Sequence, residues 1–316
     1  MYYLGIDLGG TFIKAGVVDE NGAVLYKDQL ATELEGGAEH IVDRMAIIAL
    51  DVIEKAGLKV EDIEYAGVAS PGTADREKGE MVYCSSFPFL HFPLAAKISE
   101  RTGIKKVYIE NDANAAAKGE AAVGAAKGYA SSIMITLGTG IGGGLIIDGR
   151  IYTGFNFAAA EVGHMVVDPS GPECQCGRKG CWEKLASATA MIRMAREEMV
   201  THPESLMWKL CGGDLDKVDA KVPFDAKRAG DEAGTRAVDK FIYYLACGLT
   251  NLIDLLQPEI ITVGGGVCNQ GDYLLDPVRE IVAREQYSRH GERTTKIVRA
   301  ALGNDAGMIG AAMLGR

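Results

Sequence analysis

The chain has 316 residues, 47% hydrophobic and 24% charged, a composition typical of a globular protein of about two domains. The 33 Lys and Arg residues against 43 Asp and Glu residues give a formal net charge of −10, which argues against binding to a nucleic-acid backbone. Glycine occurs 40 times, about 13% of the chain against a usual ~7%. We expect part of this excess to lie in loops that approach phosphate.

The start of the sequence lacks the basic and apolar segments of a secretory signal. No run reaches the roughly 18 apolar residues that a membrane-spanning helix needs. An odd number of cysteines without an export signal argues against a disulfide framework. We therefore expect a cytoplasmic protein that contacts no membrane and keeps its cysteines reduced. The seven cysteines are Cys84, Cys174, Cys176, Cys181, Cys211, Cys247 and Cys268.

The first third of the chain alternates strand and helix patterns. Its first three strands are short apolar runs separated by glycine-containing turns, which predicts an antiparallel meander. The later segments have the apolar spacing of amphipathic helices and of buried strands. The predicted elements are strands at 2–8, 12–18 and 23–30, a helix at about 38–57, a strand at 65–69, a helix near 93–102, a strand at 106–109 and an alanine-rich helix from Asp112.

The opening pattern of strand, glycine turn and strand returns about 130 residues later, which suggests a duplicated α/β fold. Little periodicity is present at 201–222, and we expect a surface loop with short helical pieces there. The pattern alone places a domain boundary near residue 118. The later predicted elements are strands from 131 and from 144, helices near 183–200 and 233–256, strands at 259–263 and 295–299, and a closing helix from about 303.

Three glycine turns follow predicted strands: the first at 9–10, the second at 138–140 and the third at 264–266. A residue without Cβ lets the backbone turn tightly and offer N–H groups to an anion. Asp7, just before the first turn, could organise Mg²⁺ directly or through water. Each turn could also be an ordinary hairpin or packing turn. None matches the P-loop or the dinucleotide-binding glycine pattern, so a nucleotide would be bound by another fold.

Asp112 follows an apolar strand directly and begins a helix, so its carboxylate is expected at the edge of a sheet where α/β proteins bind ligands. One interpretation is a helix N-cap. The other is a general base that takes the proton of a substrate hydroxyl during phosphoryl transfer. Asn111 and Asn114 beside it supply neutral groups that can bind hydroxyls.

Three cysteines lie within eight residues, and a histidine precedes the first of them by ten. Three thiolates and one imidazole complete the tetrahedral ligand set of a structural Zn²⁺, although the first two cysteines are closer than in the common zinc knuckle. The alternative is a group of reduced, partly buried thiols. Glu161 and Glu183 flank the cluster, so a metal loop would gather two carboxylates and an imidazole. The proposed ligands are His164, Cys174, Cys176 and Cys181.

Together these motifs resemble those of the ROK family (repressors, open reading frames and sugar kinases), within the actin-like ATPase superfamily. The resemblance covers essentially the whole chain and implies an α/β fold of two actin-like, ribonuclease H-like domains around a cleft. It places 1–117 and about 303–316 in the first domain, and 118–302, with a zinc loop at 161–183, in the second. The motifs are, in family order, 7–11, 70–72, 110–112, 136–140, 161–164, 174–183 and 264–266.

The resemblance implies an ATP-dependent hexose kinase that phosphorylates the 6-hydroxyl of a sugar, with glucose as the first choice. ATP, Mg²⁺ and a structural Zn²⁺ are the implied cofactors, and homodimers or dimers of dimers are common in the family. Asp112 corresponds to the base. The implied sugar ligands are Ser70, Gly72, Asn111, Asp112, Glu161, His164 and Glu183. The implied nucleotide-binding residues are Asp7, Gly9, Gly10, Thr11, Lys14, Gly138, Thr139, Gly140, Gly264, Gly265 and Gly266.

Two departures from the family pattern concern the sugar. Ser85 and Ser86 lie where family kinases usually carry an Asn, and Phe157 and Ala160 occupy two usual glycine positions. The reaction is therefore better specified than the hexose, and N-acetylmannosamine, N-acetylglucosamine, fructose and allose remain alternatives. A repressor of the family would carry a helix-turn-helix segment before the first strand, which here begins at about residue 2. A sugar-binding protein without catalysis is opposed by Asp7 and Asp112.

Overall fold

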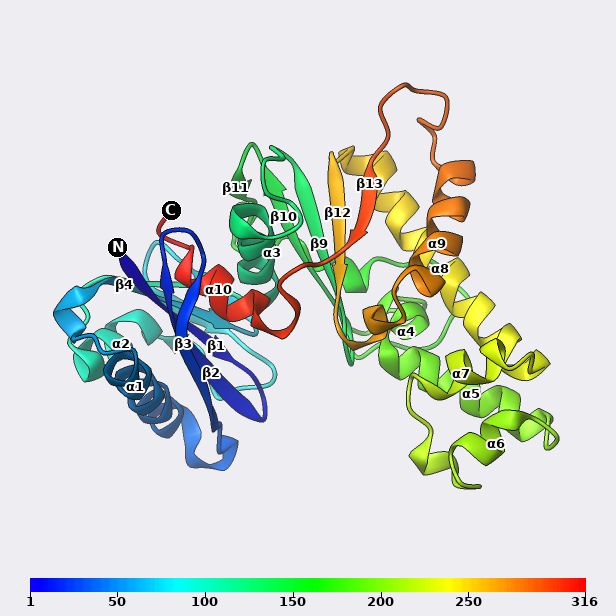
Figure 1. The fold of residues 1–316 in the computed structure, drawn as a ribbon, viewed down its shortest axis with the longest axis horizontal. Helices are drawn as coiled ribbons and strands as arrows, with labels where there is room; N and C mark the ends of the chain where they lie inside the picture. The colour runs from blue at the N-terminus through cyan, green and yellow to red at the C-terminus, as the bar shows by residue number, and fades with distance from the viewer. The chain divides into compact units, whose positions relative to one another are not determined.

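The computed structural model describes all residues, 1–316, as two compact units built from α-helices and β-strands (Figure 1). The first unit comprises Met1–Met134, Gly144–Ala160 and Ala300–Arg316. The second comprises Ile135–Gly143 and Glu161–Arg299. None of the helices combines the length and the apolarity that crossing a bilayer requires.

A five-stranded sheet of order β3-β2-β1-β4-β8 forms the centre of the first unit. The predicted antiparallel meander is confirmed, since β1 pairs with β2 and β2 with β3 in antiparallel fashion. β4 and β8 add in parallel, so the carboxyl ends of β1, β4 and β8 lie at one edge. The strands are β1 (Tyr2–Leu8), β2 (Phe12–Asp19), β3 (Val24–Ala31), β4 (Ile63–Ser70) and β8 (Val107–Asn111).

Helices cover both faces of this sheet. α1 (Gly37–Lys55) and α2 (Leu94–Thr102) pack on one face, where alternate strand residues form the main apolar core. α10 (Ala306–Ala312) packs on the other face, beside α3 (Asp112–Val123). A side chain at Gly5 or Gly67 would overlap the α10 backbone, so these two glycines allow the close approach of the C-terminal helix to β1 and β4.

A small sheet of order β5-β6-β7 follows β4. Its strands, β5 (Thr73–Asp75), β6 (Glu80–Tyr83) and β7 (Leu90–Phe92), were not expected from the sequence. Each has three or four residues, which is too short to show a period of two. This sheet fixes the segment between the end of β4 and the start of α2.

A second five-stranded sheet has the order β11-β10-β9-β12-β13. The strand predicted from residue 144 is wrong in one respect, because it reverses at Asp148 and Gly149, whose φ angles are 52° and 73°. An Asp-Gly pair with two positive φ angles is typical of a tight hairpin. The strands are β9 (Ser132–Leu137), β10 (Ile141–Ile147), β11 (Arg150–Ile151), β12 (Ile260–Gly264) and β13 (Lys296–Arg299).

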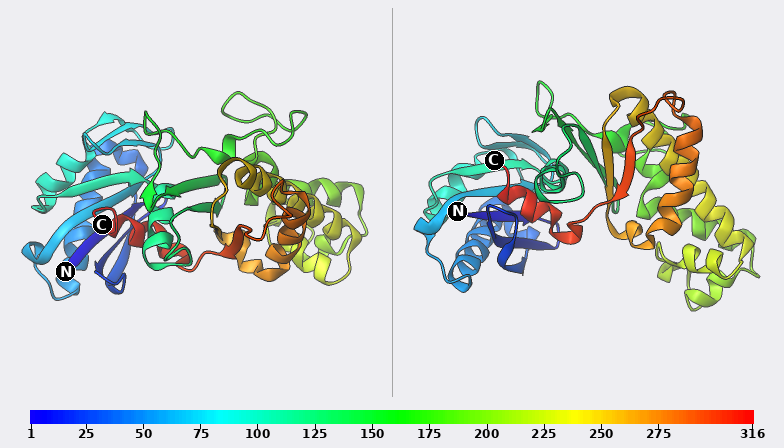
Figure 2. Two further views of the ribbon diagram at one scale, coloured as in Figure 1. Left: turned by 90° about the horizontal axis from the view of Figure 1, so that it is seen from above. Right: turned by 45° about the horizontal axis from the view of Figure 1, so that its top comes forward.

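Four helices of the second unit pack against the long α8 (Glu232–Leu256), which is yellow in Figure 2. The helix predicted at 183–200 is broken at Ser187, whose hydroxyl caps the second piece by accepting the N–H of Ala190. Trp182 is buried against Gly248 of α8 and donates its indole N–H to the carbonyl of Tyr244 at 2.8 Å. The other helices are α4 (Glu183–Ala186), α5 (Ala188–Thr201), α6 (Leu206–Leu210), α7 (Val222–Arg228) and α9 (Asp272–Glu285).

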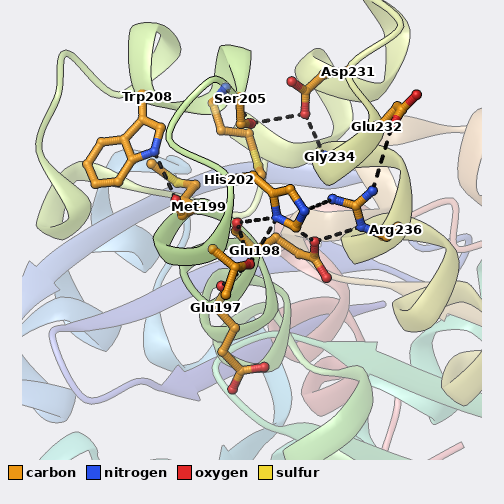
Figure 3. A network of polar contacts seen from close by, with 12 residues as sticks. Glu197, Glu198, Met199, His202, Ser205, Trp208, Asp231, Glu232, Gly234 and Arg236 are labelled. Carbon is orange, nitrogen blue, oxygen red and sulfur yellow. Dashed lines mark hydrogen bonds and ion pairs between the residues drawn. The ribbon is translucent and has the colours of Figure 1, made fainter.

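The short helical pieces predicted at 201–222 are confirmed, since the segment contains the five-residue α6. The segment is not only a surface loop, because Met207, Cys211 and Val218 are buried in a small apolar core shared with the neighbouring helices. Polar contacts tie it to the start of α8 (Figure 3). Arg236 binds both the Glu198 carboxylate and His202 Nε2, each at 2.8 Å. Asp231 accepts hydrogen bonds from Ser205 Oγ and from the backbone N–H of Leu206. These partners are distant in sequence, so local periodicity could not reveal them.

Candidate active site

The polar residues predicted for the first unit gather at the carboxyl edge of its sheet. Asp7 lies at the end of β1, Ser70 at the end of β4 and Asn111 at the end of β8. The strand registers bring them together, since Ser70 pairs with Asn111 and Asp7 pairs with Ala69. Asp112 follows Asn111 as the first residue of α3. These four residues therefore lie at one edge of the sheet, which is where the sequence placed Asp112.

The N-cap of α3 is Asn111, not Asp112. The Asn111 side-chain oxygen accepts hydrogen bonds from the backbone N–H groups of Ala113 and Asn114, at 2.9 and 3.2 Å. The Asp112 carboxylate accepts the N–H of Ala113, at 2.9 Å. Burial raises the pKa of the Asp112 carboxyl, although the hydrogen bond from Ala113 lowers it. The helix cap is thus provided by a neighbour, and the Asp112 carboxylate remains available to accept a proton.

Glu110 is a buried carboxylate that the sequence analysis did not single out. It accepts hydrogen bonds from the Asn111 backbone at 2.9 Å and from the Asn114 amide at 3.1 Å, and Arg76 lies 3.7 Å away. Burial raises the pKa of this carboxyl. Glu110 holds the strand end that presents Asn111 and Asp112. Only its position within β8 could have indicated this role, because alternate strand residues face opposite sides.

Asp7 is the third acid at this edge, after Asp112 and Glu110. Burial raises its pKa to about 6, and the nearby Lys14 opposes this shift. The Lys14 amino group donates to the carbonyl of Asn304 at 3.0 Å, and a Cβ on Gly307 would lie 2.8 Å from Asp7 Cγ. The start of α10 therefore covers Asp7. Gly9, in the adjoining turn, donates its N–H to the Phe12 carbonyl at 3.0 Å.

The turn after β4 lies beside the segment in which the family pattern expects an Asn. Gly72 has a φ of 101°, and its carbonyl accepts a hydrogen bond from the Asn111 side chain at 3.1 Å. A Cβ on Gly72 would lie 2.8 Å from that of Cys84. Ser85 and Ser86 follow directly and are exposed. Two exposed hydroxyls therefore follow Cys84, which packs against the glycine that binds Asn111.

In the second unit, two glycine turns lie side by side. Gly265, in the third glycine turn, has a φ of 95°, and a side chain on it would overlap the backbone of Leu137, which precedes the second glycine turn. Only glycine fits this approach and this backbone conformation. Gly138, Thr139 and Gly140 are exposed or half-buried. Backbone N–H groups at such turns can bind an anion.

The four predicted metal ligands come together within a single loop. Their ligand atoms all lie within 4.8 Å of one another, with 3.6 Å between Cys174 Sγ and His164 Nδ1 and 3.5 Å between Cys176 Sγ and Cys181 Sγ. A regular tetrahedron with metal–sulfur bonds of about 2.3 Å has edges of about 3.8 Å. The donor set and its spacing therefore fit a structural Zn²⁺.

Glu183 connects this metal loop with the second glycine turn. Its carboxylate lies 3.4 Å from Cys174 Sγ and 3.9 Å from His164 Nδ1. A Cβ on Gly140 would lie 2.7 Å from Glu183 Oε2. Glu183 and Gly140 also line a cavity of about 470 Å³ between the turn and the metal loop. Glu161 joins the group through its carbonyl, which accepts the N–H of His164 at 3.1 Å.

The two residues that replace family glycines retain a glycine-like backbone. Phe157 has a φ of 63° and Ala160 a φ of 70°, both in the left-handed region. Side chains in this region raise the energy of the backbone by about 1 kcal/mol or more. The backbone just before Glu161 therefore keeps a glycine-like conformation at Phe157 and Ala160, at a cost in conformational energy.

Comparisons with known proteins agree with this geometry. The chain is 41% identical to a glucokinase of Thermotoga maritima over 98% of its own length and 96% of that protein. It is 36% identical to a glucokinase of Streptomyces coelicolor, over 99% and 97% of the two chains. A crystal structure of a ROK family glucokinase from Streptomyces griseus, in complex with glucose and AMPPNP, matches with a TM-score of 0.84 and 37% identity over 99% of both chains.

These likenesses confirm the predicted α/β fold of the actin-like sugar kinases. The family model for ROK matches residues 3–316, which include every motif described above. The chain belongs to the ROK family.

Proposed function

We propose that this protein is an ATP-dependent glucokinase, which transfers the γ-phosphoryl group of ATP to the 6-hydroxyl of glucose. The observation that carries the proposal is the carboxyl edge of the first unit, where Asp112 is half-buried and Asn111, not Asp112, caps the helix. Two whole-length relatives named glucokinase, and a related structure holding glucose and AMPPNP, support the same reaction.

Asp112 is the proposed general base. A raised pKa brings a carboxylate closer to the working pH and makes it a better proton acceptor than an exposed aspartate. It would take the proton of the 6-hydroxyl as that oxygen attacks the γ-phosphorus, while the oxygen bridging the β- and γ-phosphates leaves with ADP. Asn111, held by Glu110 and Gly72, would bind a neighbouring sugar hydroxyl.

The nucleotide would be held by backbone groups of the glycine turns and by two charges. Asp7 would organise the Mg²⁺ of MgATP, and Lys14 lies near it. N–H groups of the first and second turns would bind phosphate oxygens. The third turn, without side chains, would let the adenosine lie close to the backbone. The residues assigned to the nucleotide are Asp7, Gly9, Gly10, Thr11, Lys14, Gly138, Thr139, Gly140, Gly264, Gly265 and Gly266.

The proposed sugar ligands come from both parts of the sequence. Ser70, Gly72, Asn111 and Asp112 are the proposed contributions of the first unit, and Glu161, His164 and Glu183 those of the second. Zn²⁺ held by His164 and the three cysteines would act structurally by fixing the loop. His164 would ligate the metal through one ring nitrogen and use the other to orient a hydroxyl.

We further propose the domain roles, the oligomeric state and the cellular setting. Residues 1–117 with about 303–316, and residues 118–302, would act as the two domains that close on the substrates and exclude water. A homodimer or a dimer of dimers, a cytoplasmic location and a role in glycolysis are consistent with family membership.

A panel of hexoses tests the proposal. The purified protein is assayed for ADP formation with MgATP and with glucose, N-acetylmannosamine, N-acetylglucosamine, fructose or allose, and the product is identified by NMR. We expect the highest kcat/KM with glucose and a phosphate on its 6-oxygen. A higher kcat/KM with another hexose would correct the substrate, and the absence of turnover with all of them would reject the kinase.

A further inference from the structure

The second glycine turn is held by the helix that follows the metal loop. Ala188, the first residue of α5, donates its N–H to the carbonyl of Gly138 at 2.9 Å. The hydroxyl of Thr189, the next residue, donates to the carbonyl of Thr139 at 2.8 Å. A Cβ on Gly138 would meet nothing within 4 Å, so no neighbouring group packs against that side of Gly138. Two successive carbonyls are therefore fixed by the first turn of α5.

Fixing these carbonyls also fixes the direction of two N–H groups. In a trans peptide the C=O of one residue and the N–H of the next point in opposite directions. The carbonyls of Gly138 and Thr139 point toward α5, so the N–H groups of Thr139 and Gly140 point away from it. Neither N–H has a hydrogen-bond partner in the structure. Two successive free N–H groups that face the same side can bind one anion.

The Thr189 hydroxyl has no evident role in its own helix. Ser187 already caps α5, and Thr189 is exposed, so its side chain contributes little to the core. Ala188 and Ala190 beside it carry no polar side chain. Thr189 is thus the side chain of this first helical turn that reaches the glycine turn, and it lines the same cavity as Gly140 and Glu183.

We propose that Thr189 is a positioning residue for the nucleotide: its hydroxyl holds the peptide between Thr139 and Gly140 so that the Gly140 N–H points at a phosphate oxygen. The inference rests on the proposed function of this turn. A hydrogen bond to a charged phosphate depends strongly on direction. Loss of the hydroxyl should therefore weaken nucleotide binding and leave glucose binding unchanged.

Three variants of the full chain test the role. Thr189→Val removes the hydroxyl at nearly constant shape, and Thr189→Ser keeps it. Thr235→Val is the matched control, because Thr235 also lies in the first turn of a helix, α8, and donates its hydroxyl to a carbonyl, that of Asp231 at 2.8 Å. Binding of Mg-AMPPNP is measured by calorimetry, and KM for ATP and for glucose by a coupled assay.

We expect Thr189→Val to raise the Kd of Mg-AMPPNP and the KM for ATP roughly 5- to 30-fold. The KM for glucose, the zinc content and the melting temperature should stay unchanged. Thr189→Ser should restore nucleotide affinity to within about threefold of the unmodified chain, and Thr235→Val should not alter it. A Thr189→Val protein with unchanged affinity, or with equal losses for both substrates, overturns the positioning role.

The calorimetric readout separates this inference from the proposed reaction. If the unmodified chain binds Mg-AMPPNP but phosphorylates no hexose, the proposed function fails, and the effect of Thr189→Val on the Kd still decides the inference. If the unmodified chain phosphorylates glucose and Thr189→Val binds AMPPNP normally, only the inference fails. If the unmodified chain does not bind the nucleotide, both fail.

Discussion

The first and second glycine turns are held by the same two kinds of hydrogen bond. In the first unit, the hydroxyl of Thr32 donates to the Gly9 carbonyl at 2.7 Å, and its backbone N–H donates to the Thr11 carbonyl at 2.9 Å. In the second unit, the Thr189 hydroxyl donates to the Thr139 carbonyl, and the N–H of Ala188 donates to the Gly138 carbonyl. Each turn is thus fixed through its carbonyls by one threonine hydroxyl and one backbone N–H.

The two turns differ in burial and in the charges around them. Thr32 is fully buried, whereas Thr189 is exposed. Asp7 and Asp112 lie at the edge that carries the first turn, and the metal loop lies beside the second. The backbone arrangement is therefore repeated, while the surroundings differ. In the proposed reaction, the first unit would supply the base and the Mg²⁺ carboxylate, and the second unit would supply the metal-fixed loop.

Replacing the proposed base tests this division most severely. We expect Asp112→Asn to lower kcat by roughly 10²- to 10⁴-fold, because an amide cannot take the hydroxyl proton. Glucose binding, measured by calorimetry, should remain. Asp216→Asn, which removes an exposed carboxylate of the second unit, is the charge-matched control and should keep full activity. Turnover near the unmodified level in Asp112→Asn would mean that the proton leaves by another route.

Removing one thiol tests whether the metal loop of the second unit contributes to sugar binding. Cys176→Ser should lose the bound zinc and weaken glucose binding by at least roughly 10-fold, because the loop that carries His164 and Glu183 is no longer fixed. Zinc is measured by mass spectrometry and glucose affinity by calorimetry. Cys247→Ser, outside the cluster, should change neither. A metal-free Cys176→Ser protein with normal glucose affinity would separate the metal from sugar binding.

The acid next to the first turn should make the ligand-free protein sensitive to pH. Burial raises the pKa of Asp7 to about 6 from an ordinary value of 3.8. The folded state therefore binds this proton more tightly than the unfolded state does. The stability so gained is complete below the ordinary pKa and is lost as the pH rises through about 6.

Asp7→Asn removes this loss, so it should stabilise the ligand-free protein, by at most about 3 kcal/mol at pH 8 and by less at pH 5. Melting temperatures at the two pH values measure the difference, and turnover with MgATP should fall. An equal gain at both pH values would show that the effect arises from packing rather than from the charge.

The two threonines should separate stability from binding. Thr32→Val leaves the Gly9 carbonyl without its buried partner and should lower the free energy of unfolding by about 1–3 kcal/mol. Thr189→Val, at an exposed site, should lower it by less than about 0.5 kcal/mol. Urea titration measures both. Equal losses of stability would contradict the distinction drawn between the two turns.

Much of the site was accessible from the sequence because its ligands follow strands directly. Asp112, with Asn111 beside it, could be placed at a sheet edge from its position after an apolar run, Asp7 could be placed beside a glycine turn, and His164 and the cysteines could be grouped from their chemistry. Thr189 could not be found, since its partner Thr139 is set by tertiary packing. The partners of Glu110 are local, but its burial at the end of β8 has no sequence signal beyond strand alternation. The left-handed backbone at Phe157 and Ala160 could only be inferred as a departure from family glycines, because nothing local favours it.

The order of synthesis adds a consequence to the packing of α10. This helix is far from β1 and β4 in the sequence, yet it lies directly on both strands through Gly5 and Gly67 and covers Asp7. A nascent chain that still lacks 306–312 leaves that face of the first sheet open. The first sheet therefore cannot complete its packing, or the cover over Asp7, until these residues have been synthesised and have folded back onto it.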